Sequence, residues 1–121
     1  NYDLEEISII LQDLIEQNKY IVFIACSERN ESIGLLTLYE SYALYAGGAF
    51  GTIPELYVQP AYRSSQVGLR LLLHAREFAA SKGWSRLEVT TPPLPQFDKT
   101  LAFYEREGFA ITGGRKLKMD L

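Results

Sequence analysis

Soft metal ligands and disulfide partners are nearly absent from this chain of 121 residues, which has one cysteine and one histidine. A single cysteine excludes an internal disulfide framework and favours a reducing compartment, so we expect a cytoplasmic protein. The cysteine and the histidine are also too few for an ordinary zinc site, and we expect no metal. The fold must therefore depend on its hydrophobic core, to which 47% of the residues can contribute.

Long apolar runs and an excess of positive charge are also lacking. The apolar stretch Ile21–Cys26 has the length of a buried strand, and none approaches the roughly 20 residues of a membrane-spanning helix. The first residues are acidic where a secretory signal would be basic, so we expect no membrane partner. The net charge of −3 argues against a protein that binds nucleic acid through bulk positive charge.

The charges that are present are unevenly distributed. Residues 1–60 carry nine acidic and two basic side chains, a net charge of −7, whereas residues 61–121 carry six acidic and ten basic ones, a net charge of +4. The basic half could attract a small polyanion such as a nucleotide. Alternatively, both halves simply present solvated faces, and charge alone favours this second interpretation.

The hydrophobic pattern changes from strands to helices along the chain. It predicts a helix over 4–17 with Asp3 as N-cap, followed by strands over 20–27, 33–45 and 49–58. After Pro60 it predicts a helix over 67–81, a short strand within 86–90, an irregular segment at 91–95, a helix over 97–107 and a closing hairpin in 109–121. This order predicts one domain over 1–121, with a mixed α/β (α+β) architecture.

The stretch from Glu55 to Arg70 reads as a strand, a short turn and the start of a helix. Backbone N–H groups at a helix N-terminus have no partners within the helix, and together with the helix dipole they attract anions. Here Gly68 allows close backbone approach, and Arg63, Ser64 and Ser65 add polar side chains. Because every strand-to-helix turn has some of these features, the turn alone is weak evidence for an anion site.

The same stretch resembles the acetyl-CoA-binding segment of the GNAT family of N-acetyltransferases, whose signature is Arg/Gln-x-x-Gly-x-Gly/Ala. Arg63 and Gly68 match the first and last positions, and Gln66 stands where the middle glycine is usual. If that position requires a positive φ, glutamine is disfavoured there. If the position only lends its N–H group to a phosphate, glutamine is tolerated.

A second segment, residues 101–109, resembles the family's Phe-Tyr-Glu-x-x-Gly-Phe ending and contains Tyr104. Phe97 stands seven residues before this tyrosine, where the family often has an asparagine that binds the cofactor. Two motifs in the right order are more specific than either alone. The resemblance implies a GNAT-type fold, a mixed, mostly antiparallel sheet flanked by helices, with the family's usual first strand and helix missing from this chain.

The resemblance also implies a co-substrate and the residues that bind it. Acetyl-CoA would be held by the backbone of the strand that ends at Val58, through Leu56, Tyr57 and Val58. Its pyrophosphate would lie on the turn and the helix start, which comprise Arg63, Ser64, Ser65, Gln66, Val67, Gly68 and Leu69. A catalytically weak acyl-CoA-binding or regulatory module with the same fold is the alternative function, which Gln66 and Phe97 favour slightly.

For the reaction, the resemblance implies that Tyr104 is the general acid that protonates the departing CoA thiolate. Glu55 is either the base that accepts the amine proton or a ligand of a cationic acceptor, and the two roles have similar weight. The acceptor would be a primary amine of a small molecule or peptide, and a homodimer is possible. Four tyrosines on the predicted strands could line the acceptor pocket, although sheet aromatics more often serve packing: Tyr39, Tyr42, Tyr45 and Tyr57.

Overall fold

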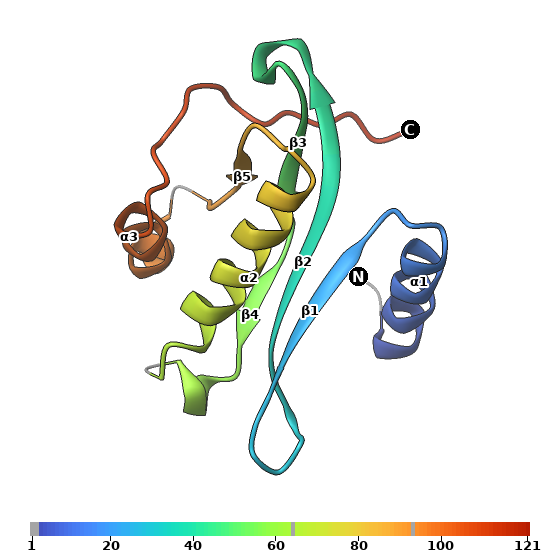
Figure 1. The fold of residues 1–121 in the computed structure, drawn as a ribbon, viewed down its shortest axis with the longest axis vertical. Helices are drawn as coiled ribbons and strands as arrows, with labels where there is room; N and C mark the ends of the chain where they lie inside the picture. Colours follow the sequence, from blue (N-terminus) through green and yellow to red (C-terminus); the bar gives the residue numbers. More distant parts are fainter. Residues whose placement is uncertain (1–2, 64, 93) are drawn as a thin grey trace. The chain divides into compact units, whose positions relative to one another are not determined.

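A computed structural model describes residues 3–63, 65–92 and 94–121, which form two compact units that divide after Thr90. The first unit contains a helix, a five-stranded sheet and a second helix (Figure 1). Its elements are α1 (Leu4–Glu16), β1 (Ile21–Cys26), β2 (Ser32–Ala43), β3 (Gly48–Ile53), β4 (Leu56–Val58), α2 (Val67–Ser81) and β5 (Leu87–Val89). The second unit contains α3 (Asp98–Arg106) and the C-terminal tail.

Helix α1 begins where the sequence predicts. The Asp3 carboxylate caps it by accepting a hydrogen bond from the N–H group of Glu6 at 2.8 Å, which satisfies a donor that the helix itself cannot pair. None of its residues is buried, however, and the side chains of Leu4, Ile7 and Ile9 are mostly or half exposed. The apolar stripe that predicts this helix therefore lies uncovered in the first unit.

The sheet is built around β2, the longest strand. Strand β1 pairs antiparallel with β2 on one side, and β3 and β4 pair antiparallel with successive parts of its other side. Strand β5 pairs parallel with β3. This mostly antiparallel sheet with flanking helices confirms the predicted fold class.

The single strand predicted over 49–58 is interrupted in the structure. Tyr39 of β2 lies opposite Thr52, whereas Leu36 lies opposite Leu56, so three residues on one strand face two on the other. Such an extra residue is a β-bulge, which bends a strand away from its neighbour. Pro54 lies within it, and proline has no N–H group to donate to a ladder, so this is where regular pairing is most easily lost.

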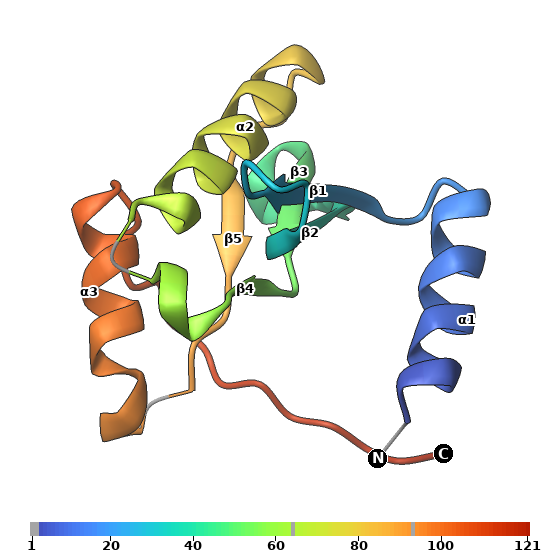
Figure 2. The same ribbon diagram turned by 90° about the horizontal axis from the view of Figure 1, so that it is seen from below.

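Helix α2 covers one face of the sheet (Figure 2). The side chains of Leu36, Leu38, Ile53 and Leu72 are fully buried between them and form the centre of the core. The close approach requires Gly34 on β2, where a Cβ atom would lie 3.0 Å from Val67 and 3.1 Å from Leu71. Because glycine has no side chain, the start of α2 can pack directly against the strand at this position.

The second unit lacks one predicted element. Helix α3 agrees with the predicted segment, but residues 110–121 contain no strand and are all exposed, so the prediction of a closing hairpin was wrong. Alternating apolar residues indicate a strand only if a partner covers one face, and an isolated hairpin is at best marginally stable in water. Nothing in this unit buries the apolar side chains of Leu117, Met119 and Leu121.

Candidate functional site

The bulge gives β4 an outer edge that no strand covers among the described residues. Strand β5 pairs with β3 as far as Ile53 and does not follow the chain into β4, which pairs with β2 alone. Thr37 donates its N–H group to the Glu55 carbonyl, and Gln59 donates its own to the Ile33 carbonyl, both at 2.9 Å. Because hydrogen-bonded pairs alternate in an antiparallel ladder, Leu56 and Val58 direct their backbone groups to the outer edge. Tyr57 directs its backbone groups to β2 instead.

The turn after β4 leads directly to the N-terminus of α2. Gln66 is the N-cap residue of this helix, with φ 64° and ψ 19°, and no side chain caps the first turn in the part of the chain that the structure describes. The N–H groups of Val67, Gly68 and Leu69 lie in that turn, where an α-helix offers them no acceptor. Ser65 lies in the turn and donates its hydroxyl to the Tyr62 carbonyl at 2.7 Å. Ser64, also predicted to bind the cofactor, lies outside the described residues.

The backbone of Gln66 decides between the two interpretations of its position. A positive φ disfavours any side chain with a Cβ atom, by about 1–2 kcal/mol. The position where the family signature has glycine therefore adopts the conformation that glycine favours, and this chain holds a glutamine there at a cost in stability.

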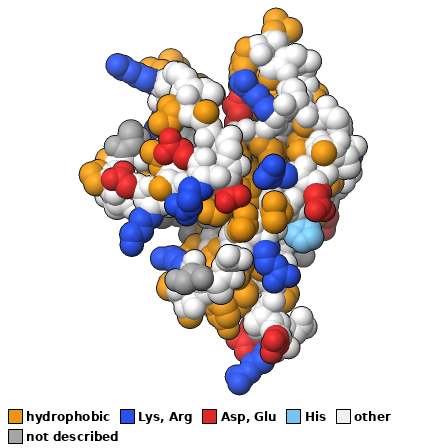
Figure 3. Space-filling model, turned by 60° about the vertical axis from the view of Figure 1, so that its left-hand side comes forward, with side chains coloured by type: hydrophobic (Ala, Val, Ile, Leu, Met, Phe, Trp, Pro, Cys, Tyr) orange, Lys and Arg blue, Asp and Glu red, His pale blue; other side chains and the backbone are white. Residues whose placement is uncertain are grey.

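Arg63 adds a positive charge at the start of this turn. Its Nε atom donates to the Val58 carbonyl at 3.0 Å, and its guanidinium carbon lies 5.8 Å from the centre of the Tyr57 ring. The arginine is exposed and links the end of β4 to the turn. Arg70 and Arg76 of α2 are exposed as well, and Figure 3 shows basic side chains next to the histidine of this helix.

The carboxylate of Glu55 is held by the neighbouring strand. Thr37 donates its hydroxyl to Oε1 of Glu55 and, in return, accepts the Glu55 N–H group at 3.1 Å. Thr37 is only 2% exposed, whereas Glu55 is exposed. A buried hydroxyl thus fixes an accessible carboxylate immediately before β4. Thr37 could not be predicted from the sequence, because a threonine within a strand carries no signal of such a contact.

Tyr104 lies in the second unit, on α3. Its ring makes edge contacts with Phe103 and Phe109, with ring centres 5.4 Å and 5.3 Å away. Only 4% of the residue is exposed, and burial raises the pKa of its phenol to about 12. The phenol is therefore protonated at neutral pH and has a proton to donate.

The structure brings most of the predicted cofactor-binding residues together but separates the tyrosines. Tyr42 donates its hydroxyl to Glu40, and Tyr45 donates its own to Glu88 at 3.1 Å, so both are engaged at the far end of β2. Tyr39 instead stacks on Tyr20, with ring centres 5.8 Å apart and planes inclined by 6°. Tyr20 was not predicted as a functional residue, because its place at the edge of an apolar strand indicates packing.

The described residues offer neither a metal site nor a membrane-spanning helix. Within residues 3–63, 65–92 and 94–121, no group of three or more His, Cys, Asp or Glu side chains could hold a metal ion. No helix among these residues is both long and apolar enough to span a membrane.

Comparisons with known proteins identify the family of the chain. A model of the acetyltransferase (GNAT) domain matches residues 18–111. The chain is 33% identical over 75 residues to glucosamine 6-phosphate N-acetyltransferase of Trypanosoma brucei brucei, a match that covers 62% of this chain and 47% of that protein. It is 27% identical over 107 residues to an uncharacterised N-acetyltransferase of Bacillus subtilis (strain 168), which covers 88% of this chain and 70% of that one.

Solved structures show the same fold. An aminoglycoside acetyltransferase from an uncultured soil metagenomic sample, solved in complex with sisomicin, superimposes with a TM-score of 0.83 at 25% identity. The match covers 100% of this chain and 78% of the other. The chain thus belongs to the GNAT family of acetyltransferases. It spans about half the length of the trypanosomal relative that it matches.

Proposed function

We propose that the protein is an acetyl-CoA-dependent N-acetyltransferase that acetylates a primary amine of a small molecule or a peptide. The observation that carries this proposal is the outer edge of β4, left open by the bulge and followed directly by the uncapped N-terminus of α2. An open strand edge pairs with an extended amide chain, and a helix N-terminus binds phosphate. Acetyl-CoA has both groups in one molecule.

The proposed binding mode uses the backbone more than side chains. Leu56 and Val58 would pair with the amides of the pantetheine arm and polarise the thioester carbonyl. The N–H groups of Val67, Gly68 and Leu69 would receive the pyrophosphate, with Arg63 and Ser65 beside it. Because these groups are fixed before the substrate arrives, they would stabilise the negative charge that develops on the carbonyl oxygen.

The reaction would be a direct transfer. The neutral amine attacks the thioester carbonyl carbon, a C–N bond forms, the C–S bond breaks, and the thiolate of CoA leaves. Glu55 would accept the proton that the amine loses or would bind a cationic acceptor, and Thr37 would orient its carboxylate in either role. Tyr104 would protonate the thiolate, which its high phenol pKa permits at neutral pH.

The acceptor is proposed only as a class. The trypanosomal relative is named for an aminosugar phosphate, and the metagenomic one was solved with an aminoglycoside. Aminosugar phosphates and aminoglycosides are both small molecules that carry amino groups, which supports a small-molecule amine as the acceptor of this protein. We also propose that residues 1–121 form one domain, that the protein is cytoplasmic and that it forms a homodimer.

Two measurements test the proposed function. Acetyl-CoA at 100 times its Kd should raise the free energy of unfolding by about 2.7 kcal/mol, seen as a higher Tm. The matched variants are Arg63→Ala, which should weaken this stabilisation, and Arg76→Ala, an exposed arginine farther along α2 that should not. No stabilisation at millimolar acetyl-CoA would contradict the proposal.

A CoA-release assay over a panel of amines then separates an enzyme from a binding module. Release of free CoA thiol that depends on an amine supports the enzyme. Stabilisation by acetyl-CoA without any release supports the alternative, a catalytically weak acyl-CoA-binding module.

A further inference from the structure

The face of the sheet opposite α2 carries a row of polar and aromatic side chains beside Glu55. Side chains alternate along a strand, so Thr37 and Tyr39 lie on one face of β2, whereas Gly34, which contacts α2, lies on the other. Thr37 holds the Glu55 carboxylate on this face. Tyr39 lies two residues along, about 7 Å away by the rise of a strand. Tyr20 stacks on Tyr39.

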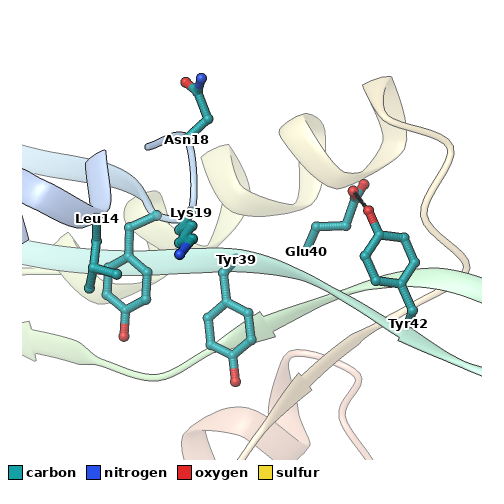
Figure 4. A pocket seen from close by; sticks show the side chains of 7 residues that line it. Leu14, Asn18, Lys19, Tyr39, Glu40 and Tyr42 are labelled. Carbon is teal, nitrogen blue, oxygen red and sulfur yellow. Dashed lines mark hydrogen bonds between the residues drawn. The ribbon is translucent and has the colours of Figure 1, made fainter. Parts of the chain in front are cut away.

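A hollow of about 440 Å³ opens at the stacked tyrosines, where β1 begins beside β2. Its polar and aromatic lining comprises Asn18, Lys19, Tyr20, Tyr39, Glu40 and Tyr42. In the close view, Tyr39 points to one side of β2, whereas Glu40 and Tyr42 point to the other (Figure 4). The two stacked rings are half-buried, so each keeps part of its surface accessible.

The electrostatic surroundings of these rings favour a positive ligand. Burial raises the pKa of the Tyr20 phenol most, and the nearby carboxylate of Glu55 raises it further, so the Glu55 charge acts at the stacked rings. An aromatic ring and phenol oxygens attract an ammonium group, and a carboxylate attracts it more strongly. Lys19 is the basic side chain that lines the hollow and opposes such a ligand, but it is exposed and screened by water.

We propose that Tyr20 and Tyr39 form an acceptor subsite that holds a second positive charge of the substrate while Glu55 receives the amine that reacts. This inference rests on the proposed function and narrows its acceptor class to diamines and larger polyamines. Thr37 occupies Oε1 of Glu55 and leaves the other carboxylate oxygen for the reacting amine. The tyrosine pair would then select acceptors by the group at their far end.

Three acceptors of similar length test the subsite. They are 1,4-diaminobutane, n-butylamine and 4-aminobutanoate, whose far ends are positive, neutral and negative. The inference predicts the lowest KM for 1,4-diaminobutane in the CoA-release assay. Equal KM values, or a preference for 4-aminobutanoate held by Lys19 and the phenol hydroxyls, would overturn it.

Variants of the two tyrosines identify the residues responsible. Tyr39→Leu removes one ring and should raise the KM for 1,4-diaminobutane about 10-fold. Tyr20→Phe keeps the stack but loses a hydroxyl and should raise it about threefold. Tyr45→Phe is the matched control, because Tyr45 pairs with Glu88 and does not line the hollow, and this variant should leave the KM unchanged. The KM for n-butylamine should not respond to any of them.

Binding provides a readout that does not need turnover. In the wild type, 1,4-diaminobutane should raise the Tm, and Tyr39→Leu should abolish that rise while the stabilisation by acetyl-CoA persists. No effect of 1,4-diaminobutane on Tm or turnover would overturn the subsite and leave the proposed function standing if acetyl-CoA still binds. Failure of acetyl-CoA to bind would contradict the proposed function instead.

Discussion

The two parts of β2 belong to one continuous strand but pair with different strands. From Tyr39 to Ala43 the strand pairs with β3, which is itself covered by β5. From Gly34 to Leu36 it pairs with β4, whose outer edge no strand covers among the described residues. The bulge at residues 53–55 separates the two parts. One extra residue thus divides the sheet into a part in which β3 is paired on both edges and a part in which β4 keeps an open edge, where we propose that acetyl-CoA binds.

The largest expected effect lies in the covered part, at Gly51. A Cβ atom there would lie 2.6 Å from the ring of Trp84 and from Leu87, both of which pack against this glycine. Gly51→Ala should therefore lower the free energy of unfolding by about 3 kcal/mol, as overpacking in a core does. Urea denaturation measures the change. Gly113→Ala, where no atom lies within 4 Å, is the control and should change little.

Tyr104 extends the comparison to the second unit. Tyr104→Phe should lower kcat by about 100-fold, because it removes the proposed proton donor and leaves the ring in place. Acetyl-CoA should stabilise the variant as much as the wild type, since the backbone groups of β4 and α2 are untouched. Wild-type turnover in the variant would contradict the assignment of Tyr104 as general acid.

The buried phenol of Tyr104 also predicts a dependence of stability on pH. Its pKa rises from 10.0 to about 12 on folding, so above pH 10 the folded chain binds more protons than the unfolded one. Stability is therefore lost between pH 10 and about 12, and this residue should contribute about 2 kcal/mol to that loss. In Tyr104→Phe the loss should be smaller by that amount in urea titrations at each pH. An identical pH profile would show that burial does not perturb this phenol.

Variants of two threonines, Thr37 on β2 and Thr52 on β3, allow a direct comparison of the open part and the covered part of the sheet. Thr37→Val removes the hydroxyl that holds Glu55, and kcat/KM should fall about 10-fold as the carboxylate loses its orientation. Thr37→Ser should restore most of the activity. Thr52 is the matched control, because its hydroxyl pairs with that of Ser41 at 2.7 Å in the covered part.

Thr52→Val should lower the free energy of unfolding by about 1 kcal/mol without changing the pH profile of the rate. Thr37→Val should shift that profile if Glu55 is the base and should raise the acceptor KM if Glu55 is a ligand. If Thr37→Val and Thr52→Val changed the activity equally, the proposal that only the open part of the sheet serves the reaction would be contradicted.

The smallest effect is expected at Gln66, where the open part ends. Gln66→Gly should raise the free energy of unfolding by about 0.5–1 kcal/mol, because glycine adopts a positive φ without steric cost. Asn30→Gly, at φ 62°, is the control and should gain less, since asparagine tolerates this conformation. Thermal unfolding measures both. A loss of stability in Gln66→Gly would show that the glutamine side chain makes a compensating contact.

Much of the fold could be predicted because local patterns carry it. The apolar spacing of residues 67–81 marks α2 to the residue, and Asp3 caps α1 as its type and position indicate. The tail from Phe109 onward was predicted wrongly as a hairpin, because an alternating pattern does not reveal whether a partner strand exists. For the candidate site, the predicted residues 56–58 form β4, where Leu56 and Val58 but not Tyr57 face the open edge, and the predicted residues 65–69 lie at the start of α2.

By itself, the sequence determined the order of the elements, the family motifs around Arg63 and Tyr104, and the strand-turn-helix that could bind an anion. Those features depend on residues near one another in the chain. Only the tertiary structure decided that β4 has an open edge, that Gln66 adopts a positive φ, and that Thr37 and Tyr20 lie beside Glu55 and Tyr39. These features arise from strand pairing and a one-residue bulge, and pairing between distant segments is set by packing that no local pattern records.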